Sequence, residues 1–144
     1  MATLLEILGD PHAIWSRQPP VSDAVIQELS ASCGFPLPAE YVSFLQFSNG
    51  GEGSLCIEPW YFQLYPVEEI IPFNRGYKVD EFLPAYFAIG SNRAGEMFVI
   101  RKREGSPCPV YMVPMVPMAE SDVVQIAHDF EMFAMAFGRD GTEM

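Results

Sequence analysis

A glycine-rich segment at residues 90–95 is the stretch of this chain whose spacing most suggests chemistry. Loops of this kind can cradle phosphate groups with their backbone N–H groups. This one lacks the lysine of a P-loop, and it lies between two apolar runs of strand-like composition instead of before a helix. In that position the backbone donors serve a hairpin. We therefore predict a turn between Gly90 and Gly95 and no phosphate site.

The titratable side chains that could form a catalytic or metal site are scattered. His12 and His128 have no motif around them, and the cysteines at positions 33, 56 and 108 lack the spacing of zinc ligands. Pairs of adjacent carboxylates are more typical of a solvated acidic surface than of an acid and base. Those pairs are Glu68-Glu69 and Asp80-Glu81. We expect no catalytic residue, no metal, no cofactor and no enzyme activity.

The remaining candidate is a protein-binding surface that combines aromatic and acidic side chains. Residues 55–65 are rich in β-formers, and their alternation separates Trp60 from Tyr61 and Tyr65. We expect Trp60 in the core and the two tyrosines at the surface, near Glu58. Aromatic anchors amid negative charge suit the capture of a basic protein. The residues expected to contact a partner are Glu52, Glu58, Tyr61, Glu68, Glu69 and Glu96.

The charge balance narrows the class of partner. Of 144 residues, nineteen are acidic and eight are basic, so the net charge is −11. Such a field repels phosphate backbones and anionic lipid surfaces and attracts basic proteins. We therefore expect a protein partner and neither nucleic-acid nor membrane binding, and the oligomeric state stays open. Unpatterned cysteines, and the absence of a signal-peptide pattern or a long apolar run, favour a cytoplasmic protein.

Helix signals mark the N-terminal part of the chain. Thr3 and Glu6 form a capping box ahead of a short helix, and Ser22 is a good N-cap for a helix that Gly34 ends. Pro38 suits the first position of the next helix, which carries one apolar stripe. We predict one domain over residues 1–144. Within it, residues 1–20 form a peripheral segment from which Trp15 packs back onto the core.

The rest of the chain predicts an antiparallel sheet and a last helix. Residues 55–65 predict one strand, although Pro59 requires an edge, a bulge or a break into two strands. A single helical turn and a long connection are expected from Pro66 to Pro84. Further strands are expected at 86–89, 97–100 and 110–113. A helix capped by Ser121 should run to Phe137, because apolar residues recur there with helical period. The fold class is then α+β, with helices packed on one face of a largely antiparallel sheet.

The chain contains several short motifs whose order along the sequence is recognisable. They are Leu37, Pro38, Tyr41, Leu45, Asn49, Gly50, Gly51, Gly90 and Gly95. With the apolar pattern near the C-terminus they resemble the SUKH superfamily, which includes bacterial toxin-immunity proteins and fungal cell-wall assembly regulators. The resemblance implies that these residues define a SUKH-like fold. It also implies a non-enzymatic protein that neutralises a cognate toxin domain, often a nuclease.

The alternative that the resemblance leaves open is a regulatory adaptor that binds signalling or cell-wall-synthesis proteins. An acidic inhibitor fits the basic cleft of a nuclease, because a nuclease must itself attract phosphate. Toxin-contacting residues do not transfer between relatives whose partners differ. The identity of the partner, and whether the chain is an active immunity factor or an orphan copy, stay open at this point.

Overall fold

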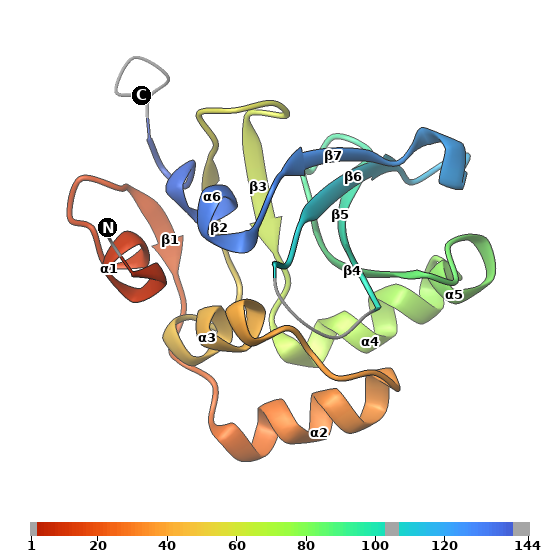
Figure 1. The fold of residues 1–144 in the computed structure, drawn as a ribbon, viewed down its shortest axis with the longest axis horizontal. Coiled ribbons are helices and arrows are strands. Elements are labelled where there is room, and N and C mark those ends of the chain that lie inside the picture. The colour runs from red at the N-terminus through yellow and green to blue at the C-terminus, as the bar shows by residue number, and fades with distance from the viewer. Residues whose placement is uncertain (1–2, 103–106, 140–144) are drawn as a thin grey trace.

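The computed structural model describes residues 3–102 and 107–139 of the chain. Its strands form one seven-stranded antiparallel sheet in the order β1 to β7 (Figure 1). The elements are α1 (Leu4–Leu8), β1 (Trp15–Arg17), α2 (Asp23–Cys33), α3 (Ala39–Phe47), β2 (Gly51–Ser54), β3 (Tyr61–Leu64), α4 (Val67–Gly76), α5 (Val79–Phe82), β4 (Tyr86–Ser91), β5 (Glu96–Arg101), β6 (Val110–Pro114), the 3-10 helix η1 (Glu120–Asp122), β7 (Val124–Ala127) and α6 (Phe130–Met135).

The N-terminal helices begin and end where the sequence supplies caps. The Thr3 hydroxyl accepts a hydrogen bond from the N–H of Glu6 at 3.2 Å at the start of α1. Ser22 caps α2 in the same way, and Gly34 ends that helix with a φ of 78°. These predictions are confirmed. Pro38 is the N-cap of α3 and not its first helical residue, a shift of one position.

Side chains of β4, β5 and β6 alternate between the two faces of the sheet, and both faces are covered. The larger core lies on the face that α1, α3 and α6 cover. A smaller cluster lies on the other face beneath α5. Its members are Val79, Leu83, Tyr86, Ala88, Met97, Val99, Tyr111, Val113 and Met118. The predicted α+β class with an antiparallel sheet is confirmed, but the helices are not confined to one face, because α5 covers the smaller cluster.

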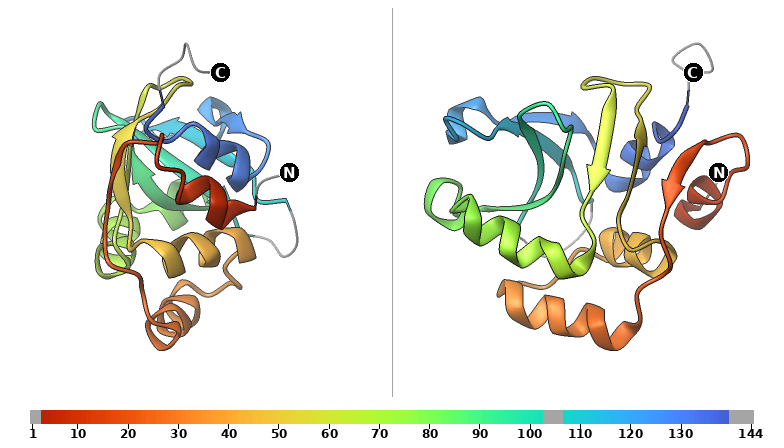
Figure 2. Two further views of the ribbon diagram at one scale, coloured as in Figure 1. Left: turned by 90° about the vertical axis from the view of Figure 1, so that its left-hand side faces the viewer. Right: turned by 180° about the vertical axis from the view of Figure 1, so that it is seen from behind.

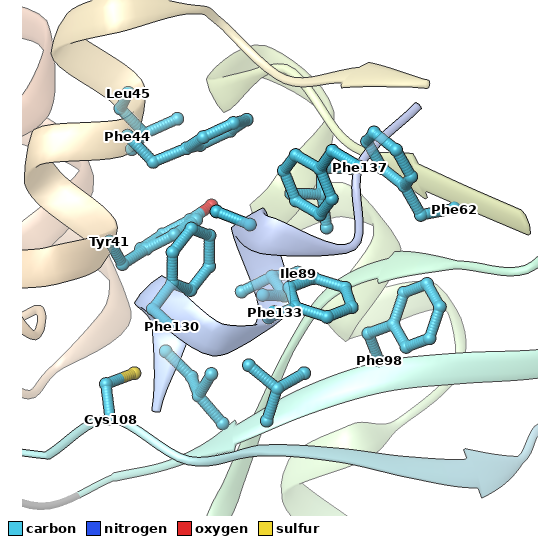
Figure 3. Close-up of a cluster of buried hydrophobic side chains, with 14 of the residues drawn as sticks. Tyr41, Phe44, Leu45, Phe62, Ile89, Phe98, Cys108, Phe130, Phe133 and Phe137 are labelled. Atoms are coloured by element: carbon cyan, nitrogen blue, oxygen red, sulfur yellow. The ribbon is translucent and has the colours of Figure 1, made fainter. Parts of the chain in front are cut away.

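Aromatic side chains dominate the larger core (Figure 3). Tyr41 and Phe44 extend from α3 toward Phe130 and Phe133 of α6, and all four are fully buried. The rings of Phe62 and Phe137 stack with their centroids 3.9 Å apart. Such rings bury large apolar areas and add favourable edge and stacking contacts. This cluster joins α3, α6 and the sheet into one packed unit.

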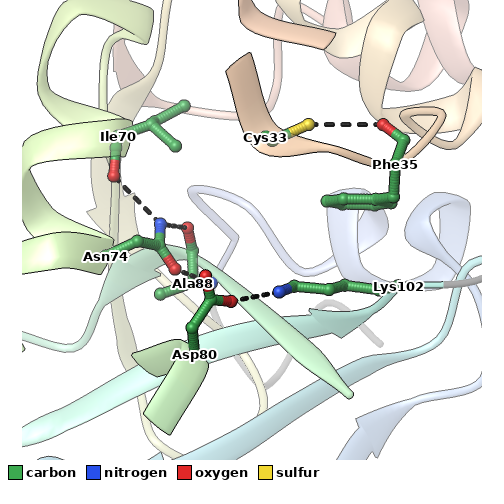
Figure 4. A network of polar contacts seen from close by, with 7 residues as sticks. All are labelled: Cys33, Phe35, Ile70, Asn74, Asp80, Ala88 and Lys102. Carbon is green, nitrogen blue, oxygen red and sulfur yellow. Dashed lines mark hydrogen bonds and ion pairs between the residues drawn. The ribbon is translucent and has the colours of Figure 1, made fainter. Parts of the chain in front are cut away.

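Polar side chains tie elements together at two further points. The Asn74 amide nitrogen of α4 donates to the carbonyl oxygens of Ile70 and Ala88, each at 2.9 Å. Its amide oxygen accepts from the N–H of Ala88, also at 2.9 Å (Figure 4). The Glu40 carboxylate of α3 accepts from the N–H groups of Cys108, at 3.0 Å, and Glu131, at 3.2 Å. Each residue thus satisfies backbone groups that are distant in sequence.

The two ends of the described chain meet at the sheet. Gly138 accepts from the N–H of Ile14 at 3.0 Å and donates to the carbonyl of Ser54 at 2.8 Å. The Trp15 ring contacts Phe44 and Phe137, with centroids 6.1 and 5.5 Å away. The segment expected to be peripheral therefore supplies the edge strand β1, and Trp15 packs onto the core as predicted.

The predicted last helix is only partly correct. Residues 124–127 form β7 and pair with β6, and η1 precedes them. The helix α6 begins later, after Asp129, whose carboxylate accepts from the N–H of Met132 at 2.8 Å. Apolar positions spaced by three and four fit a strand, a turn and a helix as well as one helix. The edge of β6 decides between them, because it pairs with Val124 and Gln125.

Two predictions for the middle of the chain are also wrong. The single strand expected at residues 55–65 is a turn followed by β3, which pairs with β2. Pro59 lies in the turn between β2 and β3, so the strand at residues 55–65 is shortened to Tyr61–Leu64 and is not divided into two. The long connection expected after residue 71 is helical, because α4 continues to Gly76 with Pro72 inside it and α5 follows. Pro72 is exposed. At this position the proline does not end the helix.

Candidate functional site

The outer face of β2 and β3 carries a compact polar cluster. Glu52 pairs with Gln63 in the sheet register, and Tyr61 lies diagonally across from it. The Tyr61 hydroxyl donates a hydrogen bond to the Glu52 carboxylate. Arg93, from the β4–β5 turn, places Nη1 3.0 Å from Oε2 of Glu52. Residues of two hairpins thus converge on one carboxylate.

Electrostatics within this cluster follow from those contacts. The hydrogen bond from Tyr61 and the ion pair with Arg93 stabilise the ionised carboxylate, so they lower the pKa of Glu52. The same bond to Glu52 raises the pKa of Tyr61, because the tyrosine donates its proton to an anion. The pKa of Arg93 is raised by Glu52 and Tyr61. At neutral pH the cluster is an anchored ion pair with a protonated phenol beside it.

The substitution Tyr61→Phe is expected to raise the pKa of Glu52 toward its ordinary value, because it removes the largest cause of the shift. A carboxyl titration followed by NMR measures this change. The folded pKa of Glu52 lies below its unfolded value. Its contribution to stability is therefore present above the unfolded pKa and lost as pH falls through the folded one.

Asp10 serves as the internal control for that titration. Its pKa is lowered by a hydrogen bond from Arg139, whose Nη2 lies 2.6 Å from its carboxylate. Asp10 lies outside the cluster, so its titration should not change in Tyr61→Phe. An unchanged Glu52 titration in the variant would show that the hydrogen bond does not govern this carboxyl.

The β2–β3 turn presents an aromatic residue that sequence reasoning placed in the core. Trp60 is 62% exposed and has a φ of 75°. Glu58, in the same turn, is also exposed. Tyr65, predicted at the surface, is instead 9% exposed and packs on Phe73 with ring centroids 4.5 Å apart. Pro59 was the available signal, because a turn at that position interrupts the alternation on which both predictions rested.

Glu96 lies at the base of the β4–β5 turn and serves that turn. Its carboxylate accepts from the Asn92 amide at 3.0 Å, and Asn92 Oδ1 accepts from the N–H groups of Ala94 and Glu96. Gly95 has a φ of 98°, which favours glycine. The turn predicted between Gly90 and Gly95 is present, and its backbone donors are used within it.

Glu68 and Glu69 lie at the opposite end of the sheet. They belong to the first turn of α4, beyond the last residue of β3. The Asn49 amide nitrogen lies 3.3 Å from each Glu68 oxygen, and Asn49 Oδ1 accepts from the N–H of Val67 at 2.8 Å. The six expected contact residues therefore do not share one surface. Four lie toward the β2–β3 and β4–β5 turns, and two lie beside α2.

We call Glu52, Glu58, Trp60, Tyr61 and Arg93 the hairpin surface. Its members mix an exposed indole, a phenol, two carboxylates and one guanidinium. Among the described residues, no group of three or more His, Cys, Asp and Glu side chains could hold a metal ion. No helix in the described ranges 3–102 and 107–139 is long and apolar enough to cross a membrane. The chemistry available at the hairpin surface is recognition by stacking, hydrogen bonding and charge.

A pocket of about 380 Å³ lies between the C-terminal end of α2 and the helices α4 and α5. The two longer helices, α2 and α4, run beside each other below the sheet (Figure 2). Cys33 lines the pocket, and its thiol donates to the carbonyls of Ser30 and Phe35 at 3.3 Å. Burial raises the pKa of this thiol, which disfavours the nucleophilic thiolate. The pocket thus lacks an activated nucleophile at its cysteine.

A family model described as the SMI1/KNR4 family (SUKH-1) matches residues 20–135. The chain belongs to the SUKH-1 family. The match spans α2 through α6, including the hairpin surface, while α1 and β1 precede it. This family is generally non-catalytic. A search of curated proteins found no match to the chain.

The residues expected from the resemblance to define the fold lie where α3 meets the sheet and at the hairpin. Tyr41 and Leu45 are fully buried, Leu37 is partly buried, and Pro38 caps α3. Gly50 has a φ of 82°, and a Cβ there would lie 2.5 Å from the Leu64 carbonyl oxygen. A Cβ at Gly90 would lie 2.3 Å from the Gln63 carbonyl oxygen. These glycines permit β3 to approach both neighbouring segments. Gly51, with a φ of 144°, lies against Trp15.

Proposed function

We propose that this SUKH-1 protein is a non-enzymatic binding protein that occupies and neutralises a basic toxin domain, of the nuclease class in particular. The observation that carries the proposal is the exposure of Trp60 beside Glu58 in the β2–β3 turn. The proposed partner is a protein, and the proposed place of action is the cytoplasm. The net charge of −11 and a family that is generally non-catalytic support this role.

Trp60 has the properties of an interface anchor. Tryptophan is enriched among the residues that dominate binding energies, because it buries a large area with little loss of rotamer entropy. A non-glycine residue with a φ of 75° carries local backbone strain. Such strain persists where the surrounding structure imposes it, and it is concentrated at functional sites. Trp60 therefore combines an exposed indole with a strained backbone position.

The charges of the hairpin surface differ in their availability to a partner. Glu52 is already engaged by Arg93 and Tyr61, so a partner must replace those contacts to use it. Glu58 is exposed, and the net negative field adds long-range attraction for a basic protein. A nuclease cleft is basic because it binds phosphate. An acidic inhibitor therefore gains association rate and discrimination from the same charges.

The experiment is affinity capture of the tagged protein from its source cells, at low and at high salt. We expect one basic protein whose recovery falls with salt. Trp60→Ala should weaken its binding by about 2 kcal/mol or more, as truncation of an interface anchor does. Glu58→Lys should also weaken the binding of this partner, and the loss should be larger at low salt than at high salt. The purified partner should lose its nuclease activity or toxicity on addition of the wild-type protein.

Phe82→Ala is the matched control, because Phe82 is 50% exposed on α5, away from the hairpin surface. It should bind like the wild type. Glu69→Lys tests the other end of the sheet, where two of the expected contact residues lie. Loss of binding in Glu69→Lys but not in Trp60→Ala would assign the contact to α4. A captured partner that has no toxic activity would favour the regulatory adaptor instead.

A further inference from the structure

The strand β7 is an open edge of the sheet. Within the described residues it pairs with β6 alone, and it is the terminal strand in the sheet order (Figure 1). Val124 and Gln125 are exposed on it. An edge strand presents unpaired N–H and C=O groups, and proteins usually block such edges with lysine, proline or a covering segment. The opposite edge, β1, carries Arg17 and is followed by Pro19 and Pro20, whereas β7 contains neither a cation nor a proline.

An apolar pocket of about 140 Å³ lies alongside this edge. It is lined by Ile57, Ile126, Ala127, Met132, Met135 and Ala136. Around it Val124, Met132 and Met135 are 55%, 53% and 43% exposed. Methionine side chains adapt to different apolar partners, and they are common on surfaces that bind peptides. The edge of β7 thus adjoins a pocket that could hold one apolar side chain.

The segment that contains β7 carries charge of one sign, although Arg101 of β5 lies over the Tyr111 ring of β6, 5.4 Å from its centroid, and interacts with Glu120. Residues 107–138 contain no lysine or arginine. Glu120 and Asp122 lie in η1 immediately before β7, and Asp129 and Glu131 follow it. A second copy of this chain would bring these carboxylates against their own counterparts. Charge complementarity therefore favours a basic occupant over a second copy.

We propose that the β7 edge binds an extended basic segment of a protein partner by strand addition. The segment's backbone pairs with β7, its cationic side chains face Glu120, Asp122 and the acids after β7, and one apolar side chain enters the methionine-lined pocket. In this mode main-chain hydrogen bonds supply affinity, and alternate side chains supply specificity. The site does not rest on the proposed function, because any partner with such a segment satisfies it.

The test uses a fluorescent heptapeptide, blocked at both ends, in which lysine alternates with valine and leucine. Fluorescence anisotropy measures its binding to the full chain. A second peptide has the same side chains but carries N-methyl groups on backbone amides. It is made in two versions, one for each edge of the strand, because methylation of alternate amides removes the donors of one edge and blocks pairing there. A third replaces every lysine with glutamate. We expect the lysine peptide to bind and both other forms to bind about tenfold more weakly or not at all.

Variants of the protein locate the site. Val124→Lys and Met132→Lys should each lower the affinity for the lysine peptide about tenfold, because each places a cation against a cationic ligand. Leu5→Lys is the matched control, since Leu5 is 56% exposed on α1. Circular dichroism confirms that each variant is folded, and having two independent variants keeps the test valid if one unfolds. Equal binding of the N-methylated peptide, equal weakening by Leu5→Lys, or no binding of the lysine peptide would overturn the proposal.

Discussion

Truncation of Phe133 to alanine is expected to lower the free energy of unfolding by about 4 kcal/mol. Phe133 is fully buried in the larger core. Its ring centroid lies 5.0 Å from that of Phe137 and 5.3 Å from that of Phe98. The substitution removes apolar area and leaves a cavity among rigid rings that cannot collapse into it. Because α6 has only six residues, it depends on this packing rather than on its own helical propensity.

Urea denaturation of the purified wild type and of Phe133→Ala measures that loss as a shift in the unfolding midpoint. Met132→Ala is the control, because the Met132 side chain lies next to Phe133 in sequence on the same helix but is 53% exposed. It should change the free energy of unfolding by about 0.5 kcal/mol or less. Equal losses in the two variants would mean that α6 contributes helical structure but little packing.

Gly50→Ala is expected to destabilise the protein by about 3 kcal/mol or more, for reasons unrelated to cavities. The new Cβ would lie 2.5 Å from the Leu64 carbonyl oxygen and 2.9 Å from the Pro66 nitrogen. Both contacts are to backbone, so relief requires β3 to move away from the end of α3. The φ of 82° adds the strain of a left-handed conformation.

Gly34→Ala separates the two terms. Gly34 has a φ of 78°, but a Cβ built there meets nothing within 4 Å. It should therefore lose only about 1 kcal/mol, the cost of the backbone conformation. The difference between the variants, measured by denaturation under one set of conditions, is the steric term at Gly50. Similar losses at both positions would show that the close approach of β3 is relieved without cost.

Local signals account for the parts of the fold that could be predicted. Thr3 and Ser22 identify the starts of helices because their hydroxyls bond to backbone only a few residues away. Phe62 and Leu64 face the core, as the alternation of their segment predicts. These properties depend on neighbours in sequence, which can be compared directly along the chain.

The failures have a common physical cause, since distant segments decide them. Residues 124–127 become a strand because β6 offers an edge, although their apolar spacing also fits a helix. Trp60 is exposed because the turn before β3 reverses the alternation that placed it inside. Arg93 reaches Glu52 across 41 positions of sequence, so no local pattern could indicate that ion pair.

The contacts of Gly138 with Ile14 and Ser54 have a consequence for the order of folding. A growing chain emerges from the ribosome N-terminus first, and domains generally fold as units. Here the carbonyl oxygens of Ala136 and Gly138 accept from the N–H groups of Cys56, after β2, and Ile14, before β1, and the N–H of Gly138 donates to Ser54 of β2. The Trp15 ring packs on Phe137. Loop closure over such separations is slow, because its entropy must be lost before these contacts form. We therefore expect the N-terminal strand and helix to become stable only after α6 has formed, when nearly the whole domain has been synthesised.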